Sequence, residues 1–276
     1  MEPVVVGTDG SWQADQAVGW AAADAVRKSR PLHIVHCGTS YEVLAAARGL
    51  AVDAQPGLSI ATELCDEPPA VALGAYADTA VEIVIGHRGR SGVRGLRLGS
   101  TGLRLAGLIP GPAVVVRGPA AGNHATVLAA VDGYDIAQHA LEYACATAAA
   151  HGSRLLVVEV WQVPARLRNP AYSRMTSLAV ADAGNRLRAA VAPWRAEYPG
   201  LDITERVVPG DRIGTLVALS ARADLAVLGS RGLNRLRSAV TGSVGHGLLR
   251  HAHCPVAVVR PSHIQPPLDA REGTRR

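Results

Sequence analysis

Two segments of the chain share one pattern of glycines, and the residue types in this pattern are those that bind phosphate. The first copy is Gly86-x2-Gly89-x9-Gly99-Ser100, and the second, 229 − 86 = 143 residues later, is Gly229-x2-Gly232-x9-Gly242-Ser243. Glycine lets the backbone turn with positive φ and approach a ligand where no Cβ stands in the way. Backbone N–H groups that open a helix bind anions. The chain therefore carries two candidate phosphate-binding loops.

Each loop follows an apolar, β-branched run that reads as a strand, Val81–Ile85 in the first copy and Leu225–Leu228 in the second. Open parallel sheets bind their ligands at the carboxyl ends of such strands. We expect Ser100 and Ser243 to be helix N-caps whose hydroxyl groups also reach a phosphate oxygen.

Two familiar nucleotide motifs are absent. A P-loop needs a Gly-Lys-Ser or Gly-Lys-Thr step, and the single lysine, Lys28, lies far from any glycine loop. A dinucleotide fingerprint needs G-x-G-x-x-G directly after the first strand. The first strands run instead into Asp9-Gly10-Ser11 and Asp132-Gly133-Tyr134, which argues against classical dinucleotide binding.

Asp9 and Asp132 each end a first strand. A carboxylate at this place can accept hydrogen bonds from a ribose. Turn chemistry offers another interpretation, an Asx turn or a helix N-cap. The two interpretations are compatible, so both residues are candidate site residues.

The chain resembles the universal stress protein family in its tandem two-domain form. The residues that carry this resemblance are Val6–Ser11, the two glycine frames, Gly242–Val244 and His251–Arg260. The resemblance identifies the frames as the ATP-binding signature of the family. It also implies that Asp9 and Asp132 contact the nucleoside, and that Cys37 and Val160 border the adenine mainly through backbone groups.

The two copies depart from the family pattern at different places. After the glycine–serine pair the second copy keeps the usual valine, Val244, whereas the first has Thr101. Cys37 also stands where the family usually has valine. We expect both sites to bind ATP, and the sequence leaves open whether Mg²⁺ accompanies the nucleotide.

The fold expected is α/β, with two tandem open five-stranded parallel sheets and helices on both faces, because apolar strand patterns alternate with helical ones. The strand order 3-2-1-4-5 in each sheet is implied by the resemblance. We predict domains at 1–118 and 124–262, and a disordered tail at 263–276. The resemblance further implies that the last strands of the domains, 113–117 and 256–259, pair antiparallel in an intramolecular pseudo-dimer.

The elements expected are the following. In the first unit, strands are expected at 3–8, 32–36, 81–85 and 113–117, with helices at 11–27, 68–79 and from Ser100, and a short helix near 43–50 broken by Gly49. In the second unit, strands are expected at 127–131, 154–161, 203–208, 225–228 and 256–259, with helices at 136–151, 175–197, 213–221 and 243–251. The first-strand aspartates are 132 − 9 = 123 residues apart, so the second unit holds 143 − 123 = 20 extra residues before its loop.

Composition excludes several classes of protein. The net charge of +5 over 276 residues is modest and dispersed, which argues against a nucleic-acid partner. No apolar run reaches the roughly 18 residues of a membrane span, and no signal pattern opens the chain, so we expect a cytoplasmic protein with no membrane partner. The four cysteines have no close-spaced pairing and read as reduced thiols.

The sequence patterns argue against a metal site and against a dedicated catalytic site. His246, His251, His253 and Cys254 are close in sequence but lack the i, i+4 spacing of a helical metal pair. The two loops are cationic because they carry Arg88, Arg90, Arg231, Arg235 and Arg237. These charges fit either a solvated basic loop or a loop that closes over a triphosphate. Phosphoryl transfer also needs metal-holding carboxylates and a base, which the loops lack.

We therefore expect an ATP-binding stress-response protein, not a dedicated enzyme, in which ATP is a regulatory ligand read by an unknown protein partner. Slow ATP hydrolysis and a further homodimer stay open. The alternatives are a weak ATPase or nucleotidyl enzyme, and a nucleotide-free interaction scaffold.

Overall fold

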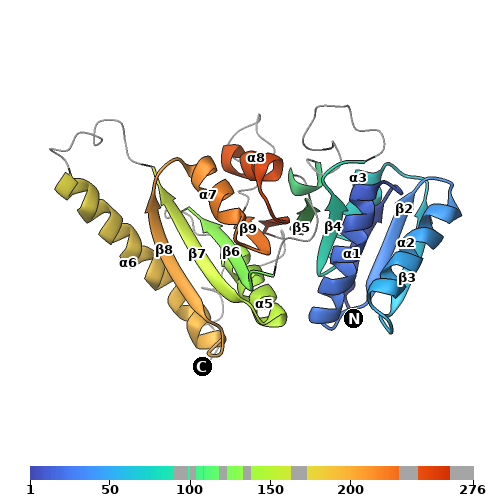
Figure 1. Ribbon diagram of the computed structural model, residues 1–276, viewed down its shortest axis with the longest axis horizontal. Coiled ribbons are helices and arrows are strands. Elements are labelled where there is room, and N and C mark those ends of the chain that lie inside the picture. Colours follow the sequence, from blue (N-terminus) through green and yellow to red (C-terminus); the bar gives the residue numbers. More distant parts are fainter. Residues whose placement is uncertain are drawn as a thin grey trace, which may run out of the picture.

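The computed structural model describes residues 1–89, 99, 104–107, 109–117, 123–132, 138–162, 173–229 and 242–261. In the N-terminal half these residues form β1 (Val4–Thr8), α1 (Trp12–Arg27), β2 (Leu32–Cys37), α2 (Tyr41–Ala54), β3 (Ile60–Cys65), α3 (Pro69–Gly74), β4 (Glu82–Gly86) and β5 (Gly111–Val116). In the C-terminal half they form β6 (Thr126–Val131), α5 (Gln138–His151), β7 (Arg154–Trp161), α6 (Ser173–Glu197), β8 (Ile203–Pro209), α7 (Arg212–Ser220), β9 (Leu225–Gly229), α8 (Gly242–His251) and β10 (Val256–Arg260). Figure 1 shows the two halves side by side in an elongated molecule.

The ten strands among the described residues form one sheet, in the order β3-β2-β1-β4-β5-β10-β9-β6-β7-β8. Neighbouring strands within each half are parallel, and each half has the predicted order 3-2-1-4-5. The halves meet where β5 and β10 pair antiparallel, with Val115 opposite Val256 and Ala113 opposite Val258. The predicted pairing of the last strands is confirmed, and it merges the two expected sheets into one.

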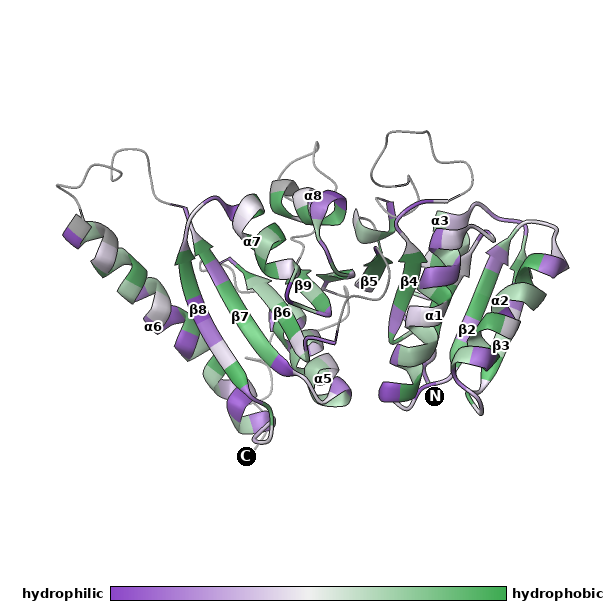
Figure 2. Cartoon of the chain, viewed as in Figure 1, coloured by the Kyte–Doolittle hydropathy of each residue, from purple (hydrophilic) through white to green (hydrophobic). Residues whose placement is uncertain are grey.

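Helices cover both faces of the sheet because the strands alternate which side chains they present to each face. Val4 and Val6 of β1 pack in the core beneath α1, α2, α5 and α6, whereas Val5 packs in the core beneath α3, α7 and α8. In Figure 2 the strands of both halves are largely green, as expected of parallel strands buried on both faces.

Two expectations for the first half are wrong. The helix expected near 43–50 runs unbroken from Tyr41 to Ala54, and Gly49 lies exposed within it. The third strand, Ile60–Cys65, lies in a stretch that carried no predicted element. This strand is the outer edge of the sheet and its middle residues are exposed, so it lacks the apolar run by which the other strands were predicted.

Part of the extra length of the second half lies in the helix after its second strand. Helix α6 has 25 residues, whereas its counterpart α2 has 14. In Figure 1 one end of α6 extends past the outer strands of the sheet. The predicted helix at 68–79 is shorter in the structure, because α3 ends at Gly74.

The domain boundaries stay a prediction. The linker residues 118–122 and the tail 263–276 lie outside the described residues. Within the part of the chain that the structure describes, none of the helices combines the length and the apolar composition needed to cross a lipid bilayer.

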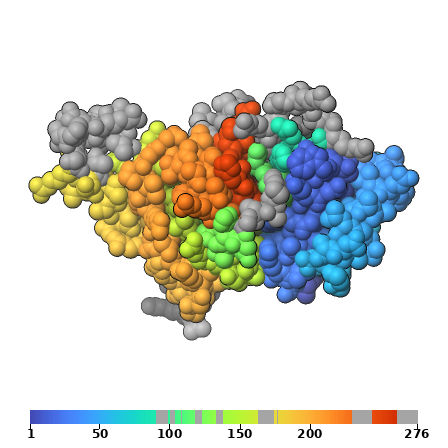
Figure 3. Space-filling model, in the orientation of Figure 1, coloured from blue at the N-terminus to red at the C-terminus, as the bar shows by residue number. Residues whose placement is uncertain are grey.

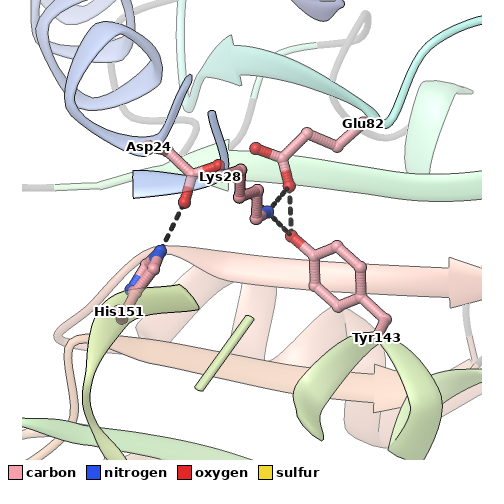
Figure 4. A network of polar contacts seen from close by, with 5 residues as sticks. All are labelled: Asp24, Lys28, Glu82, Tyr143 and His151. Atoms are coloured by element: carbon pink, nitrogen blue, oxygen red, sulfur yellow. Dashed lines mark hydrogen bonds and ion pairs between the residues drawn. The ribbon is translucent and has the colours of Figure 1, made fainter. Parts of the chain in front are cut away.

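A cluster of charged and polar side chains is buried between the two halves (Figure 4). Lys28 of α1 lies 2.7 Å from Glu82 of β4 and 2.9 Å from Asp24, and the side chains of Asp24 and Glu82 have no exposed surface. From the C-terminal half, the Tyr143 hydroxyl donates to Glu82, and His151 Nε2 lies 2.6 Å from Asp24 Oδ1. The five side chains thus connect α1 and β4 to α5.

The burial of this cluster shifts the pKa values of its members. Burial raises the pKa of Glu82 to about 8, and the charge of Asp24 adds to that effect while Lys28 opposes it. Burial lowers the pKa of His151 to about 4, so its imidazole is neutral beside Asp24. Lys28 is the cation that compensates the two buried carboxyl groups at 2.7 and 2.9 Å.

Replacing Gly49 by alanine should stabilise the protein by about 0.5–1 kcal/mol, because a helical glycine loses more backbone freedom on folding than alanine does. A Cβ at this position meets no atom within 4 Å. Gly57 is the matched control. Its surroundings are equally open, but its φ of +89° strains any other residue, so Gly57→Ala should destabilise. Urea denaturation of both variants checks the opposite signs, and a destabilised Gly49→Ala would contradict the continuous helix.

Replacing Lys28 by methionine should destabilise the protein by about 3–5 kcal/mol, because it leaves buried carboxyl groups without their cation. Arg27→Met is the control, since Arg27 is exposed on the same helix and its loss should cost within about 0.5 kcal/mol. Chemical denaturation measures both. Equal losses would show that Lys28 does not hold the cluster.

Candidate functional site

The first candidate site begins at the turn between β1 and α1. Asp9 follows β1, and its Oδ1 accepts hydrogen bonds from the Ser11 N–H at 3.0 Å and the Ser11 hydroxyl at 2.6 Å. Ser11 is the N-cap of α1 and accepts from the Ala14 N–H at 3.3 Å. Gly10 between them has a φ of 72°, a conformation that favours glycine. Asp9 thus forms the Asx turn that turn chemistry predicts, which fixes the direction of its carboxylate.

Gly86, the last residue of β4, and Gly89, three residues later, pack directly against the start of α1 and this turn. A Cβ on Gly86 would lie 2.6 Å from the Gln13 carbonyl oxygen of α1, and a Cβ on Gly89 would collide with Asp9 Oδ2. Glycine is therefore required at Gly86 by close approach to the backbone of α1, and at Gly89 a Cβ would displace the Asp9 carboxylate, whereas the positive φ of this region is found at Gly10. The strand-end aspartate and the glycine loop meet at one place, as the topology predicts.

The start and the end of the first loop are tied together. The Gly99 N–H donates to the His87 carbonyl oxygen at 2.8 Å, and the His87 N–H donates to the Val116 carbonyl oxygen at 3.0 Å. A Cβ on Gly99 would find ordinary contacts, the nearest being Arg88 Cα at 3.6 Å. Trp12, which is 60% exposed, packs its ring edge to face with His87 at a centroid distance of 6.1 Å.

The surroundings of this loop are electropositive. The pKa of His87 is lowered first by burial, and then by the positive charges of Arg117 and Arg88. Arg117 also donates to the Leu249 carbonyl oxygen of α8, so it connects the first loop to the C-terminal half. In Figure 3 α8, in red, lies between the blue N-terminal half and the orange segment of the C-terminal half.

The end of β2 closes the other side of the first site. His36 is buried, and its Nδ1 lies 2.8 Å from the Thr8 carbonyl oxygen, one residue before Asp9. Cys37 is half-buried, and its Sγ lies 2.8 Å from Sγ of Cys65 on β3. Cys37 is thus at the strand end where the sequence places the border of the adenine.

The described part of the second site repeats the strand ends of the first with other side chains. Asp132 follows β6 and lies 3.8 Å from Arg212 of α7, a half-exposed ion pair. Val160 is 5% exposed near the end of β7, and Gly229 ends β9. Helix α8 begins at Gly242, so Ser243 lies inside its first turn and the interpretation of Ser243 as the N-cap is wrong. Val244 is half-buried against the core.

One residue of the second site was missed by the sequence analysis. Glu159 is 5% exposed and pairs in register with Val131, the residue before Asp132. Burial raises its pKa, and Asp132 adds to the effect, whereas Arg186 and Arg212 oppose it. The counterpart of Glu159 is His36 (36 + 123 = 159). The sequence feature that could have indicated Glu159 is that it is a single acidic residue inside the apolar run of β7.

Several predicted site residues lie outside the described residues. They are Ser100, Thr101 and Gly232, together with Arg90, Arg231, Arg235 and Arg237. The side chain of Ser243 is also not described.

The histidines and cysteine near the C-terminus have separate surroundings. His246 Nε2 contacts Arg250 Nη1 at 3.2 Å, His253 donates its backbone N–H to Ser220 Oγ at 2.9 Å, and Cys254 is fully buried. Among the described residues, no group of three or more histidine, cysteine or acidic side chains is placed to hold a metal ion.

Comparisons with known proteins agree on one family. The family model of universal stress proteins matches residues 124–260. A universal stress protein of Mycobacterium tuberculosis (strain H37Rv) is 30% identical over 289 aligned positions, which cover 94% of this chain and 97% of the relative. Another from Mycolicibacterium smegmatis is 27% identical with the same coverage. The crystal structure of a universal stress protein from Archaeoglobus fulgidus has the same fold, with a TM-score of 0.66 at 17% identity, over 94% of this chain and 98% of that chain.

Replacing Gly86 by alanine should destabilise the protein by about 1–3 kcal/mol, because the new methyl group meets the Gln13 carbonyl oxygen and α1 has to move. Gly99→Ala is the comparison, since its methyl group has room. Thermal and urea denaturation measure the difference. A Gly86→Ala variant as stable as Gly99→Ala would contradict the close packing of the loop on α1.

Proposed function

Because the chain belongs to the universal stress protein family, we propose that it binds ATP at two sites, one in each half, and that the nucleotide is a regulatory ligand. ATP binding would change the state that a protein partner reads. The partner is the component of this proposal that the residues do not identify.

The observation that carries the proposal is the contact between the glycine loop and Asp9. Gly89 lies so close to the Asp9 carboxylate that a Cβ would collide with it. A carboxylate suited to the ribose hydroxyl groups and a loop suited to phosphates are thus adjacent, as one nucleotide requires. The same topology repeats at Asp132 and Gly229, which follow and end the neighbouring strands β6 and β9.

Charge supports the orientation of the nucleotide in the first site. Arg88 and Arg117 lower the pKa of His87, so positive charge gathers at the start of the loop and would attract a triphosphate. The ribose would then lie toward Asp9 and the base toward the end of β2. In this arrangement Cys37 and Val160 border the adenine through their backbone groups, and Ser100, Thr101, Ser243 and Val244 belong to the phosphate ends of the two sites.

The two sites should differ in affinity. In the first, Asp9 Oδ1 is held by Ser11, whereas in the second Asp132 faces Arg212 at 3.8 Å. A ribose at the second site would compete with an ion pair that is half-exposed and therefore weak. Buried Glu159 also stands where the first site has His36.

We propose binding without dedicated catalysis. Phosphoryl transfer needs a positioned base and carboxylates that hold metal ions. At the first site, Oδ1 of Asp9 already accepts two hydrogen bonds from Ser11, which assigns that oxygen to the turn. Mg²⁺ would accompany the phosphates as their counterion, and product formation well above slow background hydrolysis would instead support a weak ATPase or nucleotidyl enzyme.

Calorimetry with ATP should show two bound nucleotides per chain, and Gly99→Val and Gly242→Val should each lose one of them, because a β-branched side chain blocks the backbone approach to phosphate. Gly99→Val is a clean test, since a Cβ there has ordinary contacts with His87, Arg88 and Gly89. Titrations with Mg²⁺ and with EDTA separate the role of the ion. Unchanged stoichiometry in both variants would refute the site assignment.

GTP serves as the specificity control in the same experiment. If backbone groups at the ends of β2 and β7 read the base edge, ATP should outcompete GTP, because guanine reverses the donor and acceptor pattern and leaves buried groups unpaired. Equal competition by the two nucleotides would contradict the adenine site.

A further inference from the structure

Two cysteines face each other at the carboxyl ends of neighbouring strands. Cys37 of β2 and Cys65 of β3 are register partners, and their Sγ atoms are 2.8 Å apart. Adjacent strands lie about 4.8 Å apart, which is within the Cα separations that a disulfide bridges. Both side chains are half-buried, so a small reagent can reach them. The pair therefore has the spacing and the access that disulfide formation requires.

The pair is joined to the first candidate site by short contacts. The Cys65 thiol lies 3.6 Å from the His36 carbonyl oxygen, and the Gly38 N–H donates to the Cys65 carbonyl oxygen at 2.9 Å. His36 in turn lies 2.8 Å from the Thr8 carbonyl oxygen, beside Asp9. A change at the two sulfurs thus acts directly on the backbone that borders the base.

The second half has no cysteine pair at the corresponding positions of its strands. The counterparts are Val160 (37 + 123 = 160) and Val208 (65 + 143 = 208), which are also register partners. The other cysteines, Cys145 and Cys254, both belong to the C-terminal half and are fully buried. The paired thiols belong to the first site, and the second site is an internal reference.

We propose that Cys37 and Cys65 are a reversible thiol–disulfide site that hydroperoxides oxidise, and that the disulfide weakens ATP binding at the first site without affecting the second. The disulfide itself is independent of the proposed nucleotide function, whereas its effect on affinity rests on that function.

The chemistry balances with a hydroperoxide as the oxidant. One cysteine thiolate attacks a peroxide oxygen, the O–O bond breaks, and after proton transfer the products are a sulfenic acid and an alcohol, or water when the oxidant is hydrogen peroxide. The second cysteine attacks the sulfenic sulfur, the S–S bond forms, the S–O bond breaks, and water leaves with the thiol proton. Two electrons pass from the thiols to the peroxide, and a dithiol reductant returns them.

The surroundings make this site slow to react. Burial raises the pKa of Cys37 to about 12, and Cys65, Glu67 and Glu63 add to the effect. Because the thiolate is the nucleophile, a brief exposure to oxidant would leave the pair reduced. The site would therefore respond to sustained oxidation.

Closing the bond also moves the strand ends. A disulfide has an S–S length of about 2.05 Å, so the sulfurs have to approach by roughly 0.7 Å from their present 2.8 Å. Because β2 lies between β3 and β1, and Asp9 directly follows β1, any part of this approach that the backbone takes up would shift the end of β2 relative to Asp9. The border of the first site changes while the loop itself is untouched.

The first test treats the full chain with hydrogen peroxide for an extended time, alkylates the remaining thiols and maps unreduced peptides by mass spectrometry. A linked Cys37–Cys65 peptide that dithiothreitol removes is the expected result. Cys37→Ser and Cys65→Ser should each abolish it, and Cys145→Ser should not. A sulfinic acid at Cys37 without the linked peptide, or disulfides only between chains, would overturn the proposal.

The second test measures ATP binding to the oxidised and the reduced protein by calorimetry. We expect affinity at the first site to fall by about tenfold on oxidation, which corresponds to the loss of one well-made hydrogen bond, and affinity at the second site to stay constant. Equal affinities in both states would overturn the coupling. If neither state binds ATP while the linked peptide forms, the proposed function fails and the disulfide stands.

Discussion

The antiparallel pairing of β5 with β10 is the constraint on which the arrangement of the whole molecule depends. Each half alone would leave its fifth strand as an exposed apolar edge, and such an edge invites association with other chains. Pairing these strands satisfies their backbone groups and makes one sheet of ten strands. It also brings Arg117, which follows β5, to the Leu249 carbonyl oxygen of α8, so a side chain near the first loop contacts the C-terminal half.

The two halves share one strand order, but the side chains around their candidate sites differ. The position beside the strand-end aspartate is His36 in the first half and Glu159 in the second. In the first half, the loop approaches the β1–α1 turn through glycine because a Cβ at Gly86 would collide with the Gln13 backbone and a Cβ at Gly89 with the Asp9 carboxylate. Duplication thus repeats the features that the backbone requires, while the side chains around them are free to diverge.

A structural feature could be predicted from the sequence where it depends on residues that are close together in the chain. The strand order, the glycine loops and the Asx turn at Asp9 could be predicted, because each rests on a short pattern or on family resemblance. The edge strand Ile60–Cys65 could not, because exposure gives it no apolar run. Helix α2 continues through Gly49 because its Leu44 and Ala47 pack on the sheet and outweigh the local propensity. The buried cluster around Lys28 joins residues far apart in sequence, so no local pattern indicates it.

The cluster of Figure 4 has a further consequence, since it breaks the equivalence of the halves. The counterparts of Asp24 and Lys28 are Thr147 (24 + 123) and His151 (28 + 123), and that of Glu82 is Leu225 (82 + 143). Two copies of the first half would each bring Asp24 and Glu82 to this contact without Tyr143 and His151, and two copies of the second would lack Asp24, Lys28 and Glu82. The contact therefore selects unlike halves, which specifies the pairing within one chain over domain exchange between chains.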